Sequence, residues 1–132
     1  MIKEIVISSE INNISEVEMF IDHVTKELNV TDPLYGYIMV SVVEAFTNAV
    51  VHGNKSDFNK NVFIHADKSE KKLIFKITDQ GNGFDYSDLP DPTAPENIEN
   101  LTGRGVFLMK KLADKVDFLD NGKTVVLSFD IV

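Results

Sequence analysis

The sequence contains no cysteine and few of the residues that interrupt regular structure, with 7 glycines and 4 prolines among 132 residues. Without cysteine, the chain can form neither a disulfide framework nor a thiolate metal site. Because 43% of the residues are hydrophobic, a chain of this length can bury the core of one domain. We therefore expect a single domain over residues 1–132.

Basic residues are also scarce, since 13 lysines and arginines stand against 21 acidic residues and give a formal charge of −8. This balance repels phosphate backbones and anionic lipid. The N-terminus, Met1-Ile2-Lys3-Glu4, does not resemble a signal peptide, and no apolar run approaches the roughly 20 residues of a membrane helix. We expect a cytoplasmic protein that binds neither nucleic acid nor membranes directly.

Hydrophobic periodicity and the positions of capping and turn residues predict the order of the secondary structure elements. Ser15-Glu16-Val17-Glu18 has the form of a capping box and predicts a helix to about Asn29, while Thr31-Asp32-Pro33 begins a second helix that runs towards Gly53. Asn121-Gly122 between alternating runs predicts a hairpin. The remaining expected elements are strands at residues 2–7, 62–66, 72–78, 116–120 and 123–131 and a short helix after Gly105.

The last expected strand alternates strictly. Its apolar positions are Val125, Leu127, Phe129 and Ile131, and its polar positions are Thr124, Ser128 and Asp130. Strict alternation indicates a sheet with one buried and one exposed face. The fold class that we predict is an α/β two-layer sandwich, with a mixed, mainly antiparallel sheet and helices on one face.

The second predicted helix carries polar residues at helical spacing. Glu44, Asn48 and His52 follow one another at intervals of four residues, so a carboxylate, an amide and an imidazole share one face. The opposite arc is apolar and comprises Ile38, Val42, Ala45, Phe46 and Ala49. A solvated helix face is the alternative interpretation of the polar side.

A second constellation follows the strand at residues 72–78, where Asp79-Gln80-Gly81-Asn82-Gly83-Phe84 joins an acidic residue to two glycines. Glycine lets a ligand approach the backbone, and aspartate can accept a hydrogen bond from a ligand amine. A dinucleotide fingerprint would need a third glycine, and an EF-hand loop would need a glutamate where Pro90 stands. A plain tight turn remains an open alternative.

The third constellation is Gly103-Arg104-Gly105, directly ahead of a predicted helix with an apolar stripe of Val106, Met109 and Leu112. Free amides at a helix N-terminus favour phosphate, and arginine adds a forked cationic donor. A glycine pair that only caps a structural helix is the alternative. Residues 86–102 separate this motif from the previous one and could form a lid, and no P-loop motif is present.

Taken in order, the three motifs resemble the N, G1 and G2 boxes of the GHKL superfamily, with the Bergerat ATP-binding fold. They are E-x-x-x-N-A-x-x-H-G (Glu44–Gly53), D-x-G-x-G-F (Asp79–Phe84) and G-R-G-V-F-L-M-K-K-L-A-D (Gly103–Asp114). Their spacing and the length of the chain most resemble the anti-sigma-factor serine/threonine kinases. The resemblance spans essentially the whole chain.

This resemblance implies a role for each motif residue. Asn48 would hold Mg²⁺ at the ATP phosphates, and Glu44 would be the general base towards the attacking hydroxyl. Asp79 would bind the adenine amino group, helped through water by Thr124. Gly81 and Gly83 would shape the adenine pocket, Gly103, Arg104 and Gly105 would hold the phosphates, and His52 would have a structural role.

The resemblance also implies a function: an ATP- and magnesium-dependent protein kinase that phosphorylates an anti-anti-sigma-type protein, binds a sigma factor and forms a homodimer. Two alternatives stay open. One is a non-catalytic, ATP-gated module that sequesters a sigma factor or another partner. The other is a scaffold that binds no ATP.

Overall fold

The computed structural model describes residues 2–81 and 101–131, and of residues 101–103 only the backbone. Gly83 and most of the predicted lid lie outside the described residues. The strands are β1 (Ile2–Ser8), β2 (Asn61–Lys68), β3 (Lys72–Thr78), β4 (Lys115–Leu119) and β5 (Thr124–Asp130). The α-helices are α1 (Ile14–Glu27), α2 (Asp32–Asn48) and α3 (Leu101–Leu112), and α2 continues into a π-helical turn, Ala49–Gly53.

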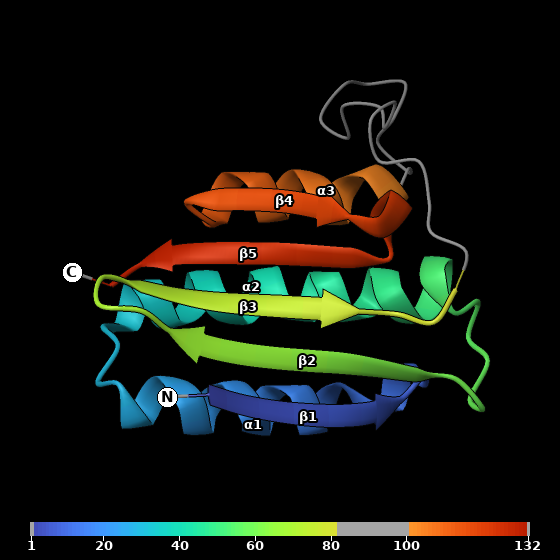
Figure 1. Cartoon of the computed structure of the whole chain (residues 1–132), viewed down its shortest axis with the longest axis horizontal. Coiled ribbons are helices and arrows are strands. Elements are labelled where there is room, and N and C mark those ends of the chain that lie inside the picture. The colour runs from blue at the N-terminus through green and yellow to red at the C-terminus, as the bar shows by residue number, and fades with distance from the viewer. Residues whose placement is uncertain (1, 82–100, 132) are drawn as a thin grey trace.

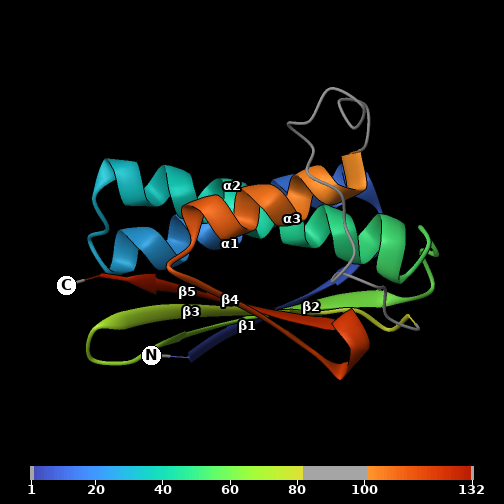
Figure 2. The same cartoon turned by 90° about the horizontal axis from the view of Figure 1, so that it is seen from above.

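The strands form one five-stranded sheet in the order β1-β2-β3-β5-β4 (Figure 1). Each strand pairing of the described residues is antiparallel. Seen from above, α1, α2 and α3 all lie on the same side of this sheet (Figure 2). The predicted two-layer sandwich with a mainly antiparallel sheet is therefore confirmed.

The core lies between the helices and the inner face of the sheet. Every residue of the predicted apolar arc of α2 is buried, and Phe46 packs there with Phe75 of β3 and Phe129 of β5 in one cluster. The rings of Phe75 and Phe129 meet edge to face with centroids 6.3 Å apart. Helix α2 is thus the central element against which the sheet and the other helices pack.

One helix of the described residues, Asp32–Gly53, is long and apolar enough to cross a membrane by length and composition. The prediction that no apolar run approaches this length is therefore wrong. Because the helix is the core helix of the sandwich, and core helices pass the same test, it is weak evidence for a membrane span.

The prediction of an exposed polar face on the last strand is only partly correct. Thr124 and Ser128 are buried, whereas Asp130 is exposed. Strand β5 lies between β3 and β4, and its neighbours on both sides shield its short polar side chains. Alternation identified the two faces of the strand but not its interior place in the sheet.

The predicted capping box does not begin α1. The helix starts at Ile14, after a 3₁₀ turn at Ile11–Asn13, so Ser15 lies inside the first turn. The N-cap residue, Asn13, makes no side-chain cap bond, and its Nδ2 donates to the carbonyl oxygen of Ser8 at 3.0 Å. The Asn13 side chain thus bonds to the end of β1, and α1 begins without a side-chain cap.

Helix α3 begins at Leu101 and not after Gly105. The Gly103-Arg104-Gly105 motif consequently belongs to the first turns of the helix and not to a loop ahead of it. Glycine is an unfavourable helix residue, and its presence here needs a packing reason, which the site provides.

Candidate functional site

Glu44 and Asn48 lie one turn apart near the end of α2, as the helical spacing predicts. Glu44 is half-buried, whereas Asn48 is only 7% exposed. The Nδ2 atom of Asn48 is buried and has no hydrogen-bond partner among the described residues. A buried amide without a partner is costly and rare, and it is typical of a group that serves a ligand.

The π-helical turn changes the geometry after Asn48. Its wider winding brings the amide of Asn54 to the carbonyl oxygen of Ala49 at 2.8 Å. His52 lies within this π-helical turn. Burial, and then the nearby charge of Lys55, lower the pKa of His52 below its ordinary value.

Asp79 follows β3 directly and is only 5% exposed. Its backbone amide donates to the carbonyl oxygen of Lys123 at 2.9 Å, and its Oδ1 accepts from the amide of Gly81 at 2.8 Å. Burial raises the pKa of Asp79 above its ordinary value, although the Gly81 hydrogen bond and the charges of Lys123 and Lys60 act in the opposite direction. The carboxylate is thus oriented by its own turn in a poorly solvated place.

Two motif glycines bring the end of α2 against this turn. A Cβ atom on Gly53 would lie 2.3 Å from Cγ of Asp79. A Cβ on Gly81 would lie 1.8 Å from the carbonyl oxygen of Gly53. Both distances are far below van der Waals contact, so any larger residue would push Asp79 and the helix end apart.

A third motif glycine brings α3 to the same place. A Cβ on Gly105 would lie 3.1 Å from both Nδ2 of Asn48 and Oε2 of Glu44. The first turns of α3 therefore rest directly on the two polar residues of α2. This close approach is the packing reason for a glycine inside the helix.

A narrow cavity of about 10 Å³ lies between these elements. Apolar side chains and the polar residues Asn48, Asp79 and Lys123 line it together. The complete lining is Ala45, Asn48, Ala49, Ile77, Asp79, Met109, Phe118, Gly122, Lys123 and Val125. An apolar slot with a carboxylate suits a flat heteroaromatic ring that carries an amine, but in this conformation its volume holds about one water molecule. A larger ligand therefore requires the lining residues to move apart.

The structure does not bring every predicted residue to this cavity. The register places Thr124 opposite Thr78, and their hydroxyls are 3.1 Å apart. Lys123 and Val125 line the cavity, whereas Thr124 is not part of its lining among the described residues. Arg104 is exposed in α3, Gly103 is described only by its backbone, and Gly83 lies outside the described residues.

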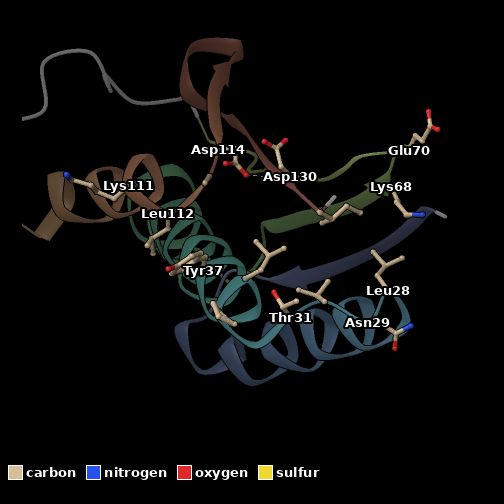
Figure 3. A pocket seen from close by; sticks show the side chains of 15 residues that line it. Leu28, Asn29, Thr31, Tyr37, Lys68, Glu70, Lys111, Leu112, Asp114 and Asp130 are labelled. Carbon is tan, nitrogen blue, oxygen red and sulfur yellow. Dashed lines mark hydrogen bonds between the residues drawn. The ribbon is translucent and has the colours of Figure 1, made fainter.

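A larger groove of about 710 Å³ lies at the opposite end of the sheet (Figure 3). It is bounded by the α1–α2 connection, the β2–β3 turn and the end of α3, with Tyr37, Lys68 and Asp114 among its lining residues. None of the predicted site residues that the structure describes lines it. The candidate functional site is therefore the narrow cavity and not the larger groove.

The sequence predicted no role for Gly53 beyond its place in the motif, and none for Asn54, which follows the motif. The close approach of Asp79 makes Gly53 a site residue, and Asn54 accepts a hydrogen bond from the amide of Gln80 beside Asp79. The signal for both was their position next to the end of the motif. Met109 and Phe118, which line the cavity, gave no signal apart from hydrophobicity.

The sequence matches the family described as "Histidine kinase-like ATPase domain" over residues 7–129. The chain belongs to this family. The match includes all three glycine-containing motifs, so the contacts at Gly53, Gly81 and Gly105 lie in a histidine kinase-like ATPase domain.

Curated relatives of this ATPase domain are serine-protein kinases named RsbW. The chain is 35% identical to RsbW of Bacillus licheniformis over 98 residues, which are 69% of this chain and 61% of the relative. It is 34% identical to RsbW of Staphylococcus aureus (strain JH9) over 97 residues, or 67% of this chain and 61% of the relative. The match thus spans less than two thirds of the length of these relatives.

A solved structure of the RsbU and RsbW domains of a protein from Mycobacterium tuberculosis shares the fold. The TM-score is 0.69 at 14% sequence identity, and the alignment covers 98% of this chain and 32% of that chain. At this identity the likeness supports the two-layer architecture of the ATPase domain alone.

Proposed function

We propose that this chain is a single-domain, ATP-dependent serine/threonine protein kinase that acts as an anti-sigma regulatory factor in the cytoplasm. The observation that carries the proposal is the convergence of Gly53, Gly81 and Gly105. Each of them lacks space for a Cβ because it holds Asp79, Asn48 or Glu44 in one place. The similarity to RsbW serine-protein kinases supports the same activity.

Asp79 is the residue that recognises the adenine base. A carboxylate held by the Gly81 amide in an apolar slot accepts a hydrogen bond from an exocyclic amine. Gly81 lies in the turn beside this carboxylate, and the role of Gly83 in the pocket remains part of the proposal, since Gly83 lies outside the described residues. Thr124 assists through water with the hydrogen-bonding capacity that its contact with Thr78 leaves free.

Asn48 is the residue that holds Mg²⁺, with its side-chain oxygen as ligand. Its place in the cavity lining fits this role, and its Nδ2 donor, which has no partner among the described residues, suits an acceptor such as a phosphate oxygen. Magnesium neutralises phosphate charge when it is bound, which is a main requirement of phosphoryl transfer. The Gly103-Arg104-Gly105 motif holds the phosphates, with free amides of the first turn of α3, the guanidinium of Arg104 and the close approach that Gly105 allows.

Glu44 is the general base. In the transfer step, the substrate hydroxyl oxygen bonds to the γ-phosphorus while the bond to the β–γ bridging oxygen breaks. ADP leaves, and Glu44 accepts the hydroxyl proton. Its position one turn before Asn48, with its Oε2 and the Asn48 amide on the same side of Gly105, supports this role. Arg104 stabilises the charge that develops during transfer.

The substrate that we propose is an anti-anti-sigma-type protein, and the second partner is a sigma factor, with the kinase acting as a homodimer. The similarity to RsbW supports a serine-kinase reaction. Because the match covers only 61% of that relative, the partners have to be tested by experiment.

The test is transfer of labelled γ-phosphate from ATP to purified anti-anti-sigma-type proteins of the source organism, alongside calorimetric binding of ATP with Mg²⁺. Glu44→Gln should bind ATP and lose transfer, whereas Asn48→Ala should lose magnesium-dependent binding. Glu70→Gln, an exposed carboxylate in the β2–β3 turn, is the matched control and should behave like the wild type.

Two results would overturn the proposal. If the wild type binds no ATP, the chain is a scaffold. If it binds ATP, and Glu44→Gln transfers phosphate at the wild-type rate or no transfer occurs to any of these proteins, the chain is an ATP-gated binding module.

A further inference from the structure

Asn54 is the centre of a buried hydrogen-bond network at the end of α2. It is 1% exposed and follows Gly53 directly. Its Nδ2 donates to Oγ of Ser9 at 2.6 Å and to the carbonyl oxygen of Asn61 at 3.0 Å. Its Oδ1 accepts from the backbone amide of Gln80 at 2.7 Å. The side chain thus joins three segments that are far apart in the sequence.

The bond to Gln80 lies in the turn that carries Asp79. Gln80 stands between Asp79 and Gly81, and its own side-chain Oε1 accepts from the amide of Asn61 at 2.7 Å. The two successive amides after Asp79 therefore have fixed partners: the amide of Gln80 bonds to Asn54, and that of Gly81 to the Asp79 carboxylate. Rotation of this turn would move the carboxylate.

Asn54 is also next to Gly53, the residue of the helix end that contacts the Asp79 carboxylate. It extends from the π-helical turn through Gly53, whose Cα faces the Asp79 carboxylate without room for a Cβ. Asn54 consequently holds the helix end and the turn after β3 at a set separation. The contact of Gly53 with Asp79 depends on that separation.

We propose that Asn54 is a positioning residue for recognition of the adenine base, acting through the Gln80 amide on the carboxylate of Asp79. This inference rests on the proposed function, since it takes Asp79 as the group that accepts a hydrogen bond from the adenine amine. Asn54 itself touches no nucleotide in this role. It sets the base selectivity of the site and not the chemistry of transfer.

A purely structural role is the competing explanation, and Ser9 distinguishes the two. Ser9 is buried, accepts from Asn54 and donates through its Oγ to the carbonyl oxygen of Lys60 at 2.9 Å. Ser9→Ala removes a hydrogen bond of the same network on the side away from Gln80. It should lower stability like Asn54→Ala without releasing the turn of Asp79.

The experiment compares the dissociation constants of ATP and of purine riboside 5′-triphosphate, which lacks the 6-amino group. We expect the wild type to prefer ATP by about tenfold, the worth of one hydrogen bond to a charged group. Asp79→Ala and Asn54→Ala should both bring the ratio of the two dissociation constants close to one, whereas Ser9→Ala should keep the wild-type ratio. Asn54→Asp retains an acceptor for the Gln80 amide and should restore most of the preference.

The inference is overturned if Asn54→Ala keeps the wild-type preference, or if Ser9→Ala loses as much of it. If Asn54→Ala does not fold, Asn54→Ser replaces it under the same criteria, since its hydroxyl is too short to keep the Gln80 contact. A wild type that binds neither nucleotide refutes the proposed function instead. A wild type that binds both equally refutes base recognition by Asp79, and this inference with it.

Discussion

Replacing Gly105 by alanine should separate stability from function. Alanine is about 1 kcal/mol more favourable than glycine in a helix interior. At Gly105, however, the new Cβ would lie 3.1 Å from Asn48 Nδ2 and Glu44 Oε2, a few tenths of an ångström too close. Such overpacking costs about 1–3 kcal/mol, which cancels or exceeds the gain from helix propensity.

Gly36 is the matched control, because it lies in the first turns of α2 and a Cβ there would meet nothing within 4 Å. Gly36→Ala should therefore keep the full propensity gain and raise the melting temperature by about 2–5 °C. Gly105→Ala should fall below Gly36→Ala by at least about 1 kcal/mol in free energy of unfolding, measured by urea denaturation.

The functional loss at Gly105 should be larger than its small change in stability would explain. Displacing Asn48 and Glu44 by a few tenths of an ångström should weaken magnesium-dependent ATP binding or phosphoryl transfer by about tenfold or more, since catalysis depends on positioning. Gly36→Ala should leave both unchanged. If Gly105→Ala is stabilised as much as Gly36→Ala and binds Mg·ATP like the wild type, the contact of α3 with Asn48 and Glu44 is not needed for function.

Other substitutions test the remaining parts of the site. Gly81→Ala should lower the free energy of unfolding by about 1–3 kcal/mol in a denaturant titration and abolish ATP binding, because its Cβ would meet the Gly53 carbonyl oxygen at 1.8 Å; wild-type binding would contradict this. Asn48→Ala should change the free energy of unfolding by less than about 1 kcal/mol, because the lost side chain includes a buried amide donor without a partner; a loss of several kcal/mol would mean that Asn48 is structural. The folded state raises the pKa of Asp79 above its ordinary value of 3.8, so protonation of Asp79 stabilises the fold. This stabilisation is complete below pH 3.8 and is lost as the pH rises through the folded-state pKa. Asp79→Asn should therefore be more stable than the wild type at pH 7, which denaturant titration measures. The ATP affinity of the wild type should fall as the pH decreases through the raised pKa, which calorimetry measures. A less stable variant, or an affinity that rises as the pH falls, would contradict this reasoning.

Local patterns were enough to predict most of the fold. The apolar spacing of Ile38, Val42 and Phe46 identified the buried face of α2, and alternation in β5 identified the inner face of the sheet. These patterns are informative because burial on one face repeats with the period of the element itself. The predicted start of α1 was wrong because a 3₁₀ turn at Ile11–Asn13 already leads into the helix ahead of Ser15, and the capping-box pattern does not contain that turn.

The sequence by itself determined which residue types the site has: a glutamate and an asparagine one turn apart, an aspartate after a strand, and the glycines of three motifs. Only the tertiary structure decided how they meet. It placed Gly53 against Gly81 and Gly105 against Asn48. It also paired the hydroxyls of Thr124 and Thr78 and bonded Asn54 to the turn that carries Asp79. The reason is physical: spacing along the chain fixes neighbours within one element, whereas contacts between elements depend on helix ends, sheet order and close approaches that no local period encodes.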